Sequence, residues 1–112
     1  MTLSQKQQQF TQMVGQLIAW SFANGYALTL GEAYRTPEQA KLNAASGAGI
    51  VNSLHIQRLA IDFNLFIGGV YQTDSKAFLP LGEYWESLGG SWGGRFKKPD
   101  GNHFSLEHNG VR

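Results

Sequence analysis

The first quarter of the chain places apolar residues three and four positions apart. The apolar positions are Phe10, Met13, Val14, Leu17 and Ile18. This spacing predicts an amphipathic helix with one buried face. Thr2 or Ser4 can cap its start, and Ser4 with Gln7 fits a capping box. The dipeptide at residues 24–25, Asn-Gly, predicts its end.

The clearest strand pattern covers residues 58–67. One face carries Leu59, Ile61, Phe63, Leu65 and Ile67, and the other carries Arg58, Ala60, Asp62, Asn64 and Phe66. Imperfect alternation over residues 26–34 predicts a second strand. Residues 103–107 predict a last strand with Phe104 and Leu106 toward the core. The Gly pair at 68–69 predicts a turn, with residues 70–72 pairing back as a short hairpin arm.

Two further helices are predicted between these strands. Thr36, Pro37 and Glu38 have the residue types of a helix start, so a short helix begins there. A third helix covers residues 75–88 and is interrupted or restarted near Pro80. Small residues over 44–53 and glycines over 91–102 predict loops.

Length and composition restrict the class of protein. A chain of 112 residues predicts one domain, residues 1–112. A net charge of +1 is too small to favour a nucleic-acid partner. No apolar run approaches the roughly 20 residues of a membrane span, and the polar N-terminus lacks the apolar segment of a cleavable signal peptide. We therefore expect a monomer that is made in the cytoplasm.

The absence of cysteine leaves histidine and carboxylate as the possible metal ligands. Asp62 lies mid-strand opposite the apolar row, where burial without a partner is costly. His55 precedes that strand, and His103 begins the last one, so the two can meet Asp62 if the strands are neighbours. Periodicity alone leaves a solvent-facing Asp62 as open as a ligating one, and a lone His103 is more often an ordinary half-buried residue than a ligand.

Asp100 lies three residues before His103, across a Pro-Asp-Gly-Asn turn. From there its carboxylate can reach a water molecule at such a site without ligating the metal. The alternative is a plain turn aspartate, a common role in such sequences. His108, near the end of the chain, is expected to be exposed.

Three segments together resemble the M15 metallopeptidases. Residues 53–62, SLHIQRLAID, resemble the family signature S-x-H-x-x-G-x-A-x-D, and residues 100–103, DGNH, resemble its closing (D/E)-x-x-H. Residues 33–39, AYRTPEQ, resemble the upstream segment that supplies an arginine. The Trp-Gly-Gly at 92–94 is similar to the phage-type branch. These segments occur in the family's order over residues 33–106.

The resemblance implies a fold and a set of roles. The family's fold is α+β, a small central antiparallel sheet with flanking helices, Hedgehog/DD-peptidase-like. By resemblance His55, Asp62 and His103 would hold one Zn²⁺. Asp100 would be the general base, Arg35 would stabilise the oxyanion, and Ser53 would touch substrate or support the site.

Two positions carry competing interpretations. Arg58 stands where the family pattern has Gly, and a long cation on the Asp62 face could pair with a carboxylate or occlude the site. Arg35 could instead form a surface ion pair with Glu32 or Glu38.

The family comprises D-Ala-D-Ala carboxypeptidases and dipeptidases, and phage endolysins that cut the L-alanyl-D-glutamate bond. We expect an endolysin of the second kind, a zinc enzyme that reaches the peptidoglycan stem peptide after phage or prophage release. The alternatives are a D-Ala-D-Ala carboxypeptidase and a non-catalytic zinc or wall-binding module on the same fold. A non-haem iron oxygenase usually spaces its His and carboxylate two residues apart, against seven here. A tail or assembly protein has no positive feature beyond small size.

Overall fold

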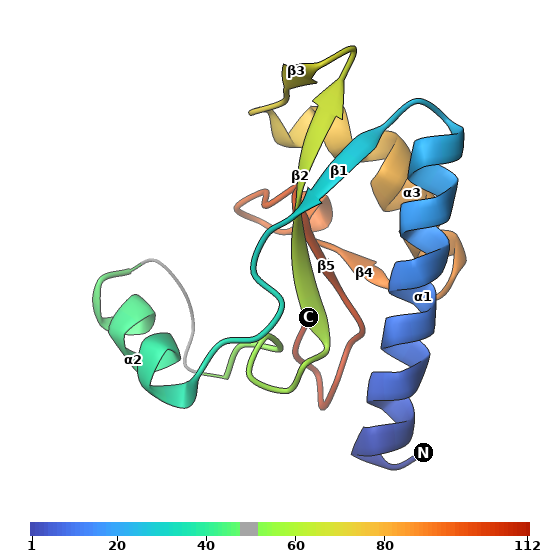
Figure 1. The fold of residues 1–112 in the computed structure, drawn as a ribbon. Coiled ribbons are helices and arrows are strands. Elements are labelled where there is room, and N and C mark those ends of the chain that lie inside the picture. The colour runs from blue at the N-terminus through green and yellow to red at the C-terminus, as the bar shows by residue number, and fades with distance from the viewer. Residues whose placement is uncertain (48–51) are drawn as a thin grey trace.

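A five-stranded antiparallel sheet packed against helices forms the protein in a computed structural model that describes residues 1–47 and 52–112 (Figure 1). The strand order is β1-β2-β5-β4, and β3 also pairs with β2. The elements are α1 (Leu3–Ala23), β1 (Ala27–Leu30), α2 (Pro37–Ala45), β2 (Ala60–Ile67), β3 (Val70–Tyr71), α3 (Leu79–Ser87), β4 (Ser91–Trp92) and β5 (His103–Ser105), with 3₁₀ turns at Ser75–Phe78 and Gly93–Arg95. The predicted α+β class is confirmed.

Helix α1 forms where the apolar spacing predicts it. Phe10, Met13 and Leu17 are buried, and α1 ends at Ala23, with Asn24 as its C-cap residue. The predicted capping box is wrong by two residues. Thr2 caps the helix and exchanges hydrogen bonds with Gln5, because a helix that starts at residue 3 already contains the other candidate cap in its first turn.

The core lies between the sheet and the pair of helices α1 and α3, which lie on the same side of it (Figure 1). Trp85 of α3 is fully buried, and its indole N–H donates to the carbonyls of Ser105 at 2.9 Å and Ser91 at 3.1 Å. Phe10 and Phe104 meet the Trp85 ring edge-on, with centroids 5.7 and 5.9 Å away. This single side chain therefore ties α3 to the ends of β4 and β5.

Among the described residues no helix covers the opposite face of the sheet, and α2 stands apart from it (Figure 1). Helix α2 begins at Pro37 with Thr36 as cap, as predicted, and extends to Ala45 into the predicted loop, of which residues 48–51 lie outside the described ranges. In the part of the chain that is described, no helix has the length and apolar character needed to cross a membrane.

Several predicted bounds change. The predicted strand over 26–34 contracts to β1, and the last strand contracts to β5. The predicted restart of the third helix near Pro80 is confirmed, because a 3₁₀ turn precedes α3, which begins at Leu79. The hairpin of β2 and β3 is confirmed. Strand β4 was missed inside a predicted loop, because two residues are too few to show an alternating pattern.

Arg58 is not part of β2 but closes the turn before it, with a left-handed φ of 55°. This conformation favours glycine, which gives a physical reason for the family's Gly at this position. The Arg58 guanidinium lies over the ring of Tyr34, 4.0 Å from its centroid. The expected position on the Asp62 face is therefore wrong, because the turn reverses the direction of the side chain.

We predict that two substitutions at Arg58 differ in their effect on the free energy of unfolding. Arg58→Gly relieves the backbone strain, which offsets the lost cation–π contact of about 0.5–1 kcal/mol. Arg58→Val keeps the strain, adds a β-branched side chain and should lower the free energy of unfolding by roughly 1–3 kcal/mol. Chemical denaturation of both variants measures the difference. A valine variant as stable as the glycine variant would contradict the prediction.

Candidate metal centre

The pairing of β2 with β5 places an aspartate directly beside a histidine. The two strands are antiparallel, and Asp62 is the register partner of His103. Side chains of register partners point to the same face of a sheet. The condition under which Asp62 and His103 were expected to meet, that these two strands are neighbours, is fulfilled.

His55 reaches the same point from the turn that precedes β2. Backbone N–H groups of Gln57 and Leu59 both donate to the carbonyl of Leu54, which closes the turn. The buried Ser53 hydroxyl accepts a hydrogen bond from the backbone N–H of His55 at 3.2 Å. Ser53 thus has a structural role in holding the turn, and its predicted contact with substrate stays a prediction.

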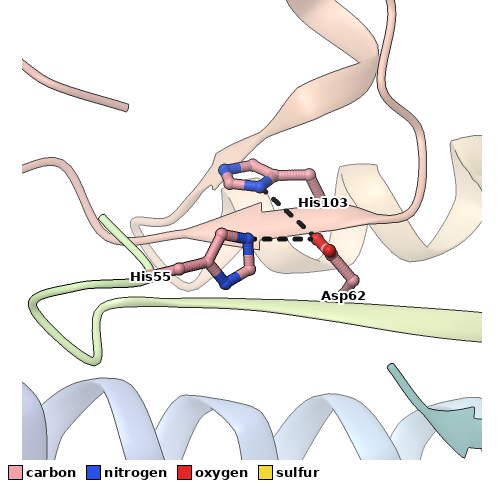
Figure 2. A group of neighbouring side chains, drawn as sticks. All are labelled: His55, Asp62 and His103. Carbon is pink, nitrogen blue, oxygen red and sulfur yellow. Dashed lines mark ion pairs between the residues drawn. The ribbon is translucent and has the colours of Figure 1, made fainter. Parts of the chain in front are cut away.

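Three side chains converge on one point, as Figure 2 shows. Asp62 Oδ1 lies 3.4 Å from His55 Nε2 and 3.5 Å from His103 Nδ1. One ligand atom from each residue lies within 4.8 Å of the others. Both imidazoles are buried, and Asp62 is partly exposed. The three residues are therefore close enough to share one metal ion.

The hydrogen bonding of His55 fits a metal ligand. Its Nδ1 lies 3.4 Å from the carbonyl oxygen of Ala33, which can only accept, so Nδ1 carries the proton. The lone pair of Nε2 then points toward Asp62. Asp62 Oδ1 is itself buried and has no hydrogen-bond partner among the described residues. Two acceptor atoms that face one another in this way repel each other, and a cation bound between them would stabilise the arrangement.

The electrostatics keep Asp62 in its ligating form. Partial burial alone would raise the pKa of the Asp62 carboxyl. The facing imidazoles of His103 and His55 outweigh that effect and lower the pKa to about 2. Asp62 is therefore ionised near neutral pH.

The donor set fits zinc. Two imidazole nitrogens and one carboxylate oxygen are ligands that Zn²⁺ accepts in tetrahedral sites, and three protein ligands leave a fourth position open. The three ligands also line an open cleft, which gives that fourth position access to solvent. The predicted set of His55, Asp62 and His103 is thus brought together, and its chemistry agrees with the zinc cofactor.

All six residues singled out from the sequence line this one cleft of about 540 Å³, together with Lys98, Arg112, Phe96, Pro99 and Gly47. The six are Arg35, Ser53, His55, Asp62, Asp100 and His103. Arg58 is not among the lining residues, so the expected occlusion of the site is wrong. His108 is also outside the cleft. It is half-buried beside Lys6 rather than exposed as expected, with His108 Nδ1 3.4 Å from Lys6 Nζ.

The surroundings of Asp100 raise the pKa of its carboxyl group. Loss of solvent around the carboxyl raises its pKa, an effect increased by the negative charge of Asp62 and opposed by His103, His55 and Arg35. The residue as a whole remains exposed at the mouth of the cleft. A carboxyl group with a raised pKa is better suited to exchange protons near neutral pH.

A set of contacts missed in the sequence fixes Asp100 beside His103. The N–H of Asp100 donates to the carbonyl of Gly93, and the N–H of His103 donates to the carbonyl of Asp100. The Trp92 indole donates to the carbonyl of Gly101 at 2.7 Å. A Cβ on Gly93 would lie 2.2 Å from the backbone carbonyl oxygen of Asp100, so only glycine fits. The Trp-Gly-Gly motif was the available signal, and its role is to hold this turn.

Arg35 forms an ion pair and also lines the cleft, and its role toward an oxyanion stays a prediction. Its guanidinium forms an ion pair with Glu32, as one alternative expected, through Nε at 2.8 Å and a second, shorter contact. It nevertheless lines the cleft and is mostly buried. The ion pair therefore lies at the site and not on the outer surface.

Residues 31–35 lie beside the site and form backbone hydrogen bonds with both Asp62 and His55. Gly31 donates to the carbonyl of Asp62, and Asp62 donates back to the carbonyl of Glu32. Arg35 donates from its backbone to the carbonyl of His55. A Cβ on Gly31 would lie 2.8 Å from the Asp62 carbonyl oxygen, so the close approach requires glycine.

Fold and site together define a small α+β metal-binding protein whose ligands lie on a sheet face beside a turn. The family described as D-alanyl-D-alanine carboxypeptidase, a group of the M15 peptidases, matches residues 46–106. The chain belongs to the M15 peptidase family. It is also similar to the L-alanyl-D-glutamate peptidase of Listeria phage A118, at 33% identity over 103 residues that cover 85% of this chain. The chain spans about a third of that relative's length, 36%.

Two solved structures share the fold. The L-Ala D-Glu endopeptidase ChiX of Serratia marcescens superposes with a TM-score of 0.69 at 20% identity, over 87% of this chain and 79% of that one. The D,D-pentapeptidase VanY of a VanB-type resistance cassette, solved as its E175A mutant with Zn(II), superposes with a TM-score of 0.60 at 17% identity, over 87% and 70%. At these identities the likeness confirms the predicted fold.

We predict that Gly31→Ala weakens metal binding. The added methyl group must push residue 31 away from the Asp62 backbone, which displaces a ligand and costs roughly 1–3 kcal/mol of stability. Gly15→Ala is the matched control, because nothing lies within 4 Å of its added Cβ, and it should stabilise α1 by up to about 1 kcal/mol. Zinc titration against a chromophoric chelator and thermal unfolding measure both. Equal zinc affinity in the two variants would contradict the prediction.

Proposed function

We propose that this chain is a zinc-dependent peptidase that cuts the L-alanyl-D-glutamate bond of the peptidoglycan stem peptide, and that residues 1–112 act as one peptidase domain. The observation that carries the proposal is that three metal ligands, a carboxylate and an arginine line the same open cleft. The choice of bond is supported by the phage relative, which is named for an activity on that bond.

The residues of the cleft suit hydrolysis of a peptide bond. When bound, Zn²⁺ polarises a carbonyl group and lowers the pKa of water toward about 7. Asp100 would take a proton from water as the water oxygen bonds to the carbonyl carbon of L-Ala. The bond from that carbon to the D-Glu nitrogen then breaks, and Asp100 returns the proton to the leaving amine.

Arg35 would stabilise the negative charge that develops on the carbonyl oxygen. Its guanidinium is charged at every working pH and carries several N–H donors in a fixed plane. Because the Glu32 carboxylate accepts hydrogen bonds from the guanidinium and fixes its orientation, the remaining donors need little reorganisation when the charge appears. The proposed role therefore needs the ion pair and is not in competition with it.

Lys98 and Arg112 add two further cations to the lining of the cleft. A stem peptide with a free carboxylate on its D-Glu residue has the complementary charge. We propose that this peptide is the partner, reached at the cell wall after release of the protein during lysis.

A D-Ala-D-Ala carboxypeptidase is the second candidate, favoured by the description of the family that matches residues 46–106. The same cleft and the same proton transfers would serve it, with terminal D-Ala as the leaving group. A non-catalytic module is less well supported, because a wall-binding role needs neither the Asp100 carboxyl nor its raised pKa.

We predict that purified peptidoglycan incubated with the zinc-loaded protein yields new amino termini at D-Glu. Asp100→Asn should lower kcat roughly 10²–10⁴-fold, because the isosteric amide cannot take a proton. It should bind zinc as the unchanged protein does, whereas His103→Ala should not. Mass spectrometry of the released peptides identifies the bond, and chelated protein is the control.

The products separate the candidates. Release of terminal D-Ala alone would replace the endopeptidase by the carboxypeptidase. Tight zinc binding with no cleavage of either bond, on walls of several peptide types, would rule out the peptidase and favour a binding module.

We also predict that Arg35→Ala lowers kcat by roughly 10²–10³-fold with a smaller change in KM, because an oxyanion donor acts mainly in the transition state. Steady-state kinetics on a soluble stem-peptide substrate measure both constants. An effect confined to thermal stability, with kcat unchanged, would mean that Arg35 serves only as a surface ion pair.

A further inference from the structure

Glu32 lies beside both Arg35 and the metal ligand His55, a position that its sequence pattern predicted only as an ion-pair partner of Arg35. Its Oε1 accepts two hydrogen bonds from the Arg35 guanidinium. The same oxygen lies 3.8 Å from Nδ1 of the metal ligand His55. One carboxylate oxygen thus connects the arginine of the cleft with a ligand of the metal.

The position of Glu32 is fixed by backbone contacts to the third side of the site. Its carbonyl accepts from the Asp62 N–H at 2.9 Å, and its neighbour Gly31 donates to the Asp62 carbonyl at 2.8 Å. The next carbonyl, that of Ala33, accepts from His55 Nδ1 at 3.4 Å. The backbone of Glu32 is therefore anchored to β2 beside the metal ligands.

We propose that Glu32 is a positioning residue that sets the orientation of Arg35 and of the His55 ring together. Negative charge near Nδ1 of a ligating imidazole stabilises the Nδ1–H tautomer and raises the donor strength of Nε2. The paired hydrogen bonds fix the guanidinium plane, which is otherwise free about several bonds. The Arg35 part of this inference rests on the proposed function, whereas the His55 part requires only metal binding.

The alternative is a simple ion pair that stabilises the fold. The chain contains a matched example, because Glu86 receives two hydrogen bonds from Arg95, each 3.1 Å long. That pair does not line the cleft, and the Arg95 side chain is 54% exposed. Glu86→Ala therefore removes a Glu–Arg pair of the same kind without touching the site.

The first readout is zinc affinity, measured on metal-free protein by competition with a chromophoric chelator. Glu32→Ala should weaken zinc binding about 10-fold, the lower end of the usual effect of removing such an outer carboxylate. Glu86→Ala should leave it unchanged. Glu32→Gln keeps the volume of the side chain, and its zinc affinity should lie between those of the two alanine variants. It provides the same comparison if Glu32→Ala does not fold.

The second readout is kinetic and is made at saturating zinc. Glu32→Ala should lower kcat about 10-fold with little change in KM, because a loosely held Arg35 loses part of its effect on the transition state. In an Arg35→Ala background the same substitution should lower kcat by less than about twofold, because the residue through which it acts is gone.

Two results would overturn the proposal. Zinc affinity of Glu32→Ala equal to that of Glu86→Ala would remove the link to His55. A full kcat loss that persists in the Arg35→Ala background would remove the link to Arg35. If the unchanged protein cleaves no wall substrate, the proposed function fails, and the zinc titration alone then decides whether Glu32 positions His55.

Discussion

The pairing of β2 with β5 in a single register is the constraint on which the site depends. Asp62 and His103 are 41 positions apart in the chain, and only the antiparallel ladder brings them opposite one another. A shift of one residue would turn one of the two toward the apolar core. Trp85 stabilises the register from behind, because its indole N–H donates to the carbonyl of Ser105 at the end of β5. The metal centre is thus specified by the same packing that specifies the core.

The sequence predicted the two strands of this ladder from their apolar faces, and left their pairing as a condition. Alternation around Phe63 and Phe104 identified both strands, and the residues left on the opposite face were the two ligands. The motif around His55 supplied the third ligand, although a turn has no periodicity of its own. The position of these three residues was therefore predictable, because hydrophobic patterning and a motif pointed to the same face.

Other features could not be predicted because they depend on contacts between distant segments. Strand β4 has two residues, and its existence depends on β5 beside it. The left-handed backbone at Arg58 breaks the usual preference for glycine, and so the residue was placed on a strand that it does not enter. Glu32 is adjacent to the site only because backbone hydrogen bonds continue past the end of β1. Roles assigned by resemblance to Asp100, Arg35 and Ser53 remain predictions, although all three side chains line the cleft.

The spacing of the ligands along the chain has a consequence for folding. An ion held by His55 and His103 would join two points 48 residues apart, and the loop that it closes contains β2, β3, α3 and β4. The chain contains no cysteine, so no disulfide can restrict this loop in the unfolded state. The metal would act as a reversible cross-link, one whose contribution to stability follows the concentration of free zinc. The stability of the folded chain would then depend on the metal supply of its surroundings.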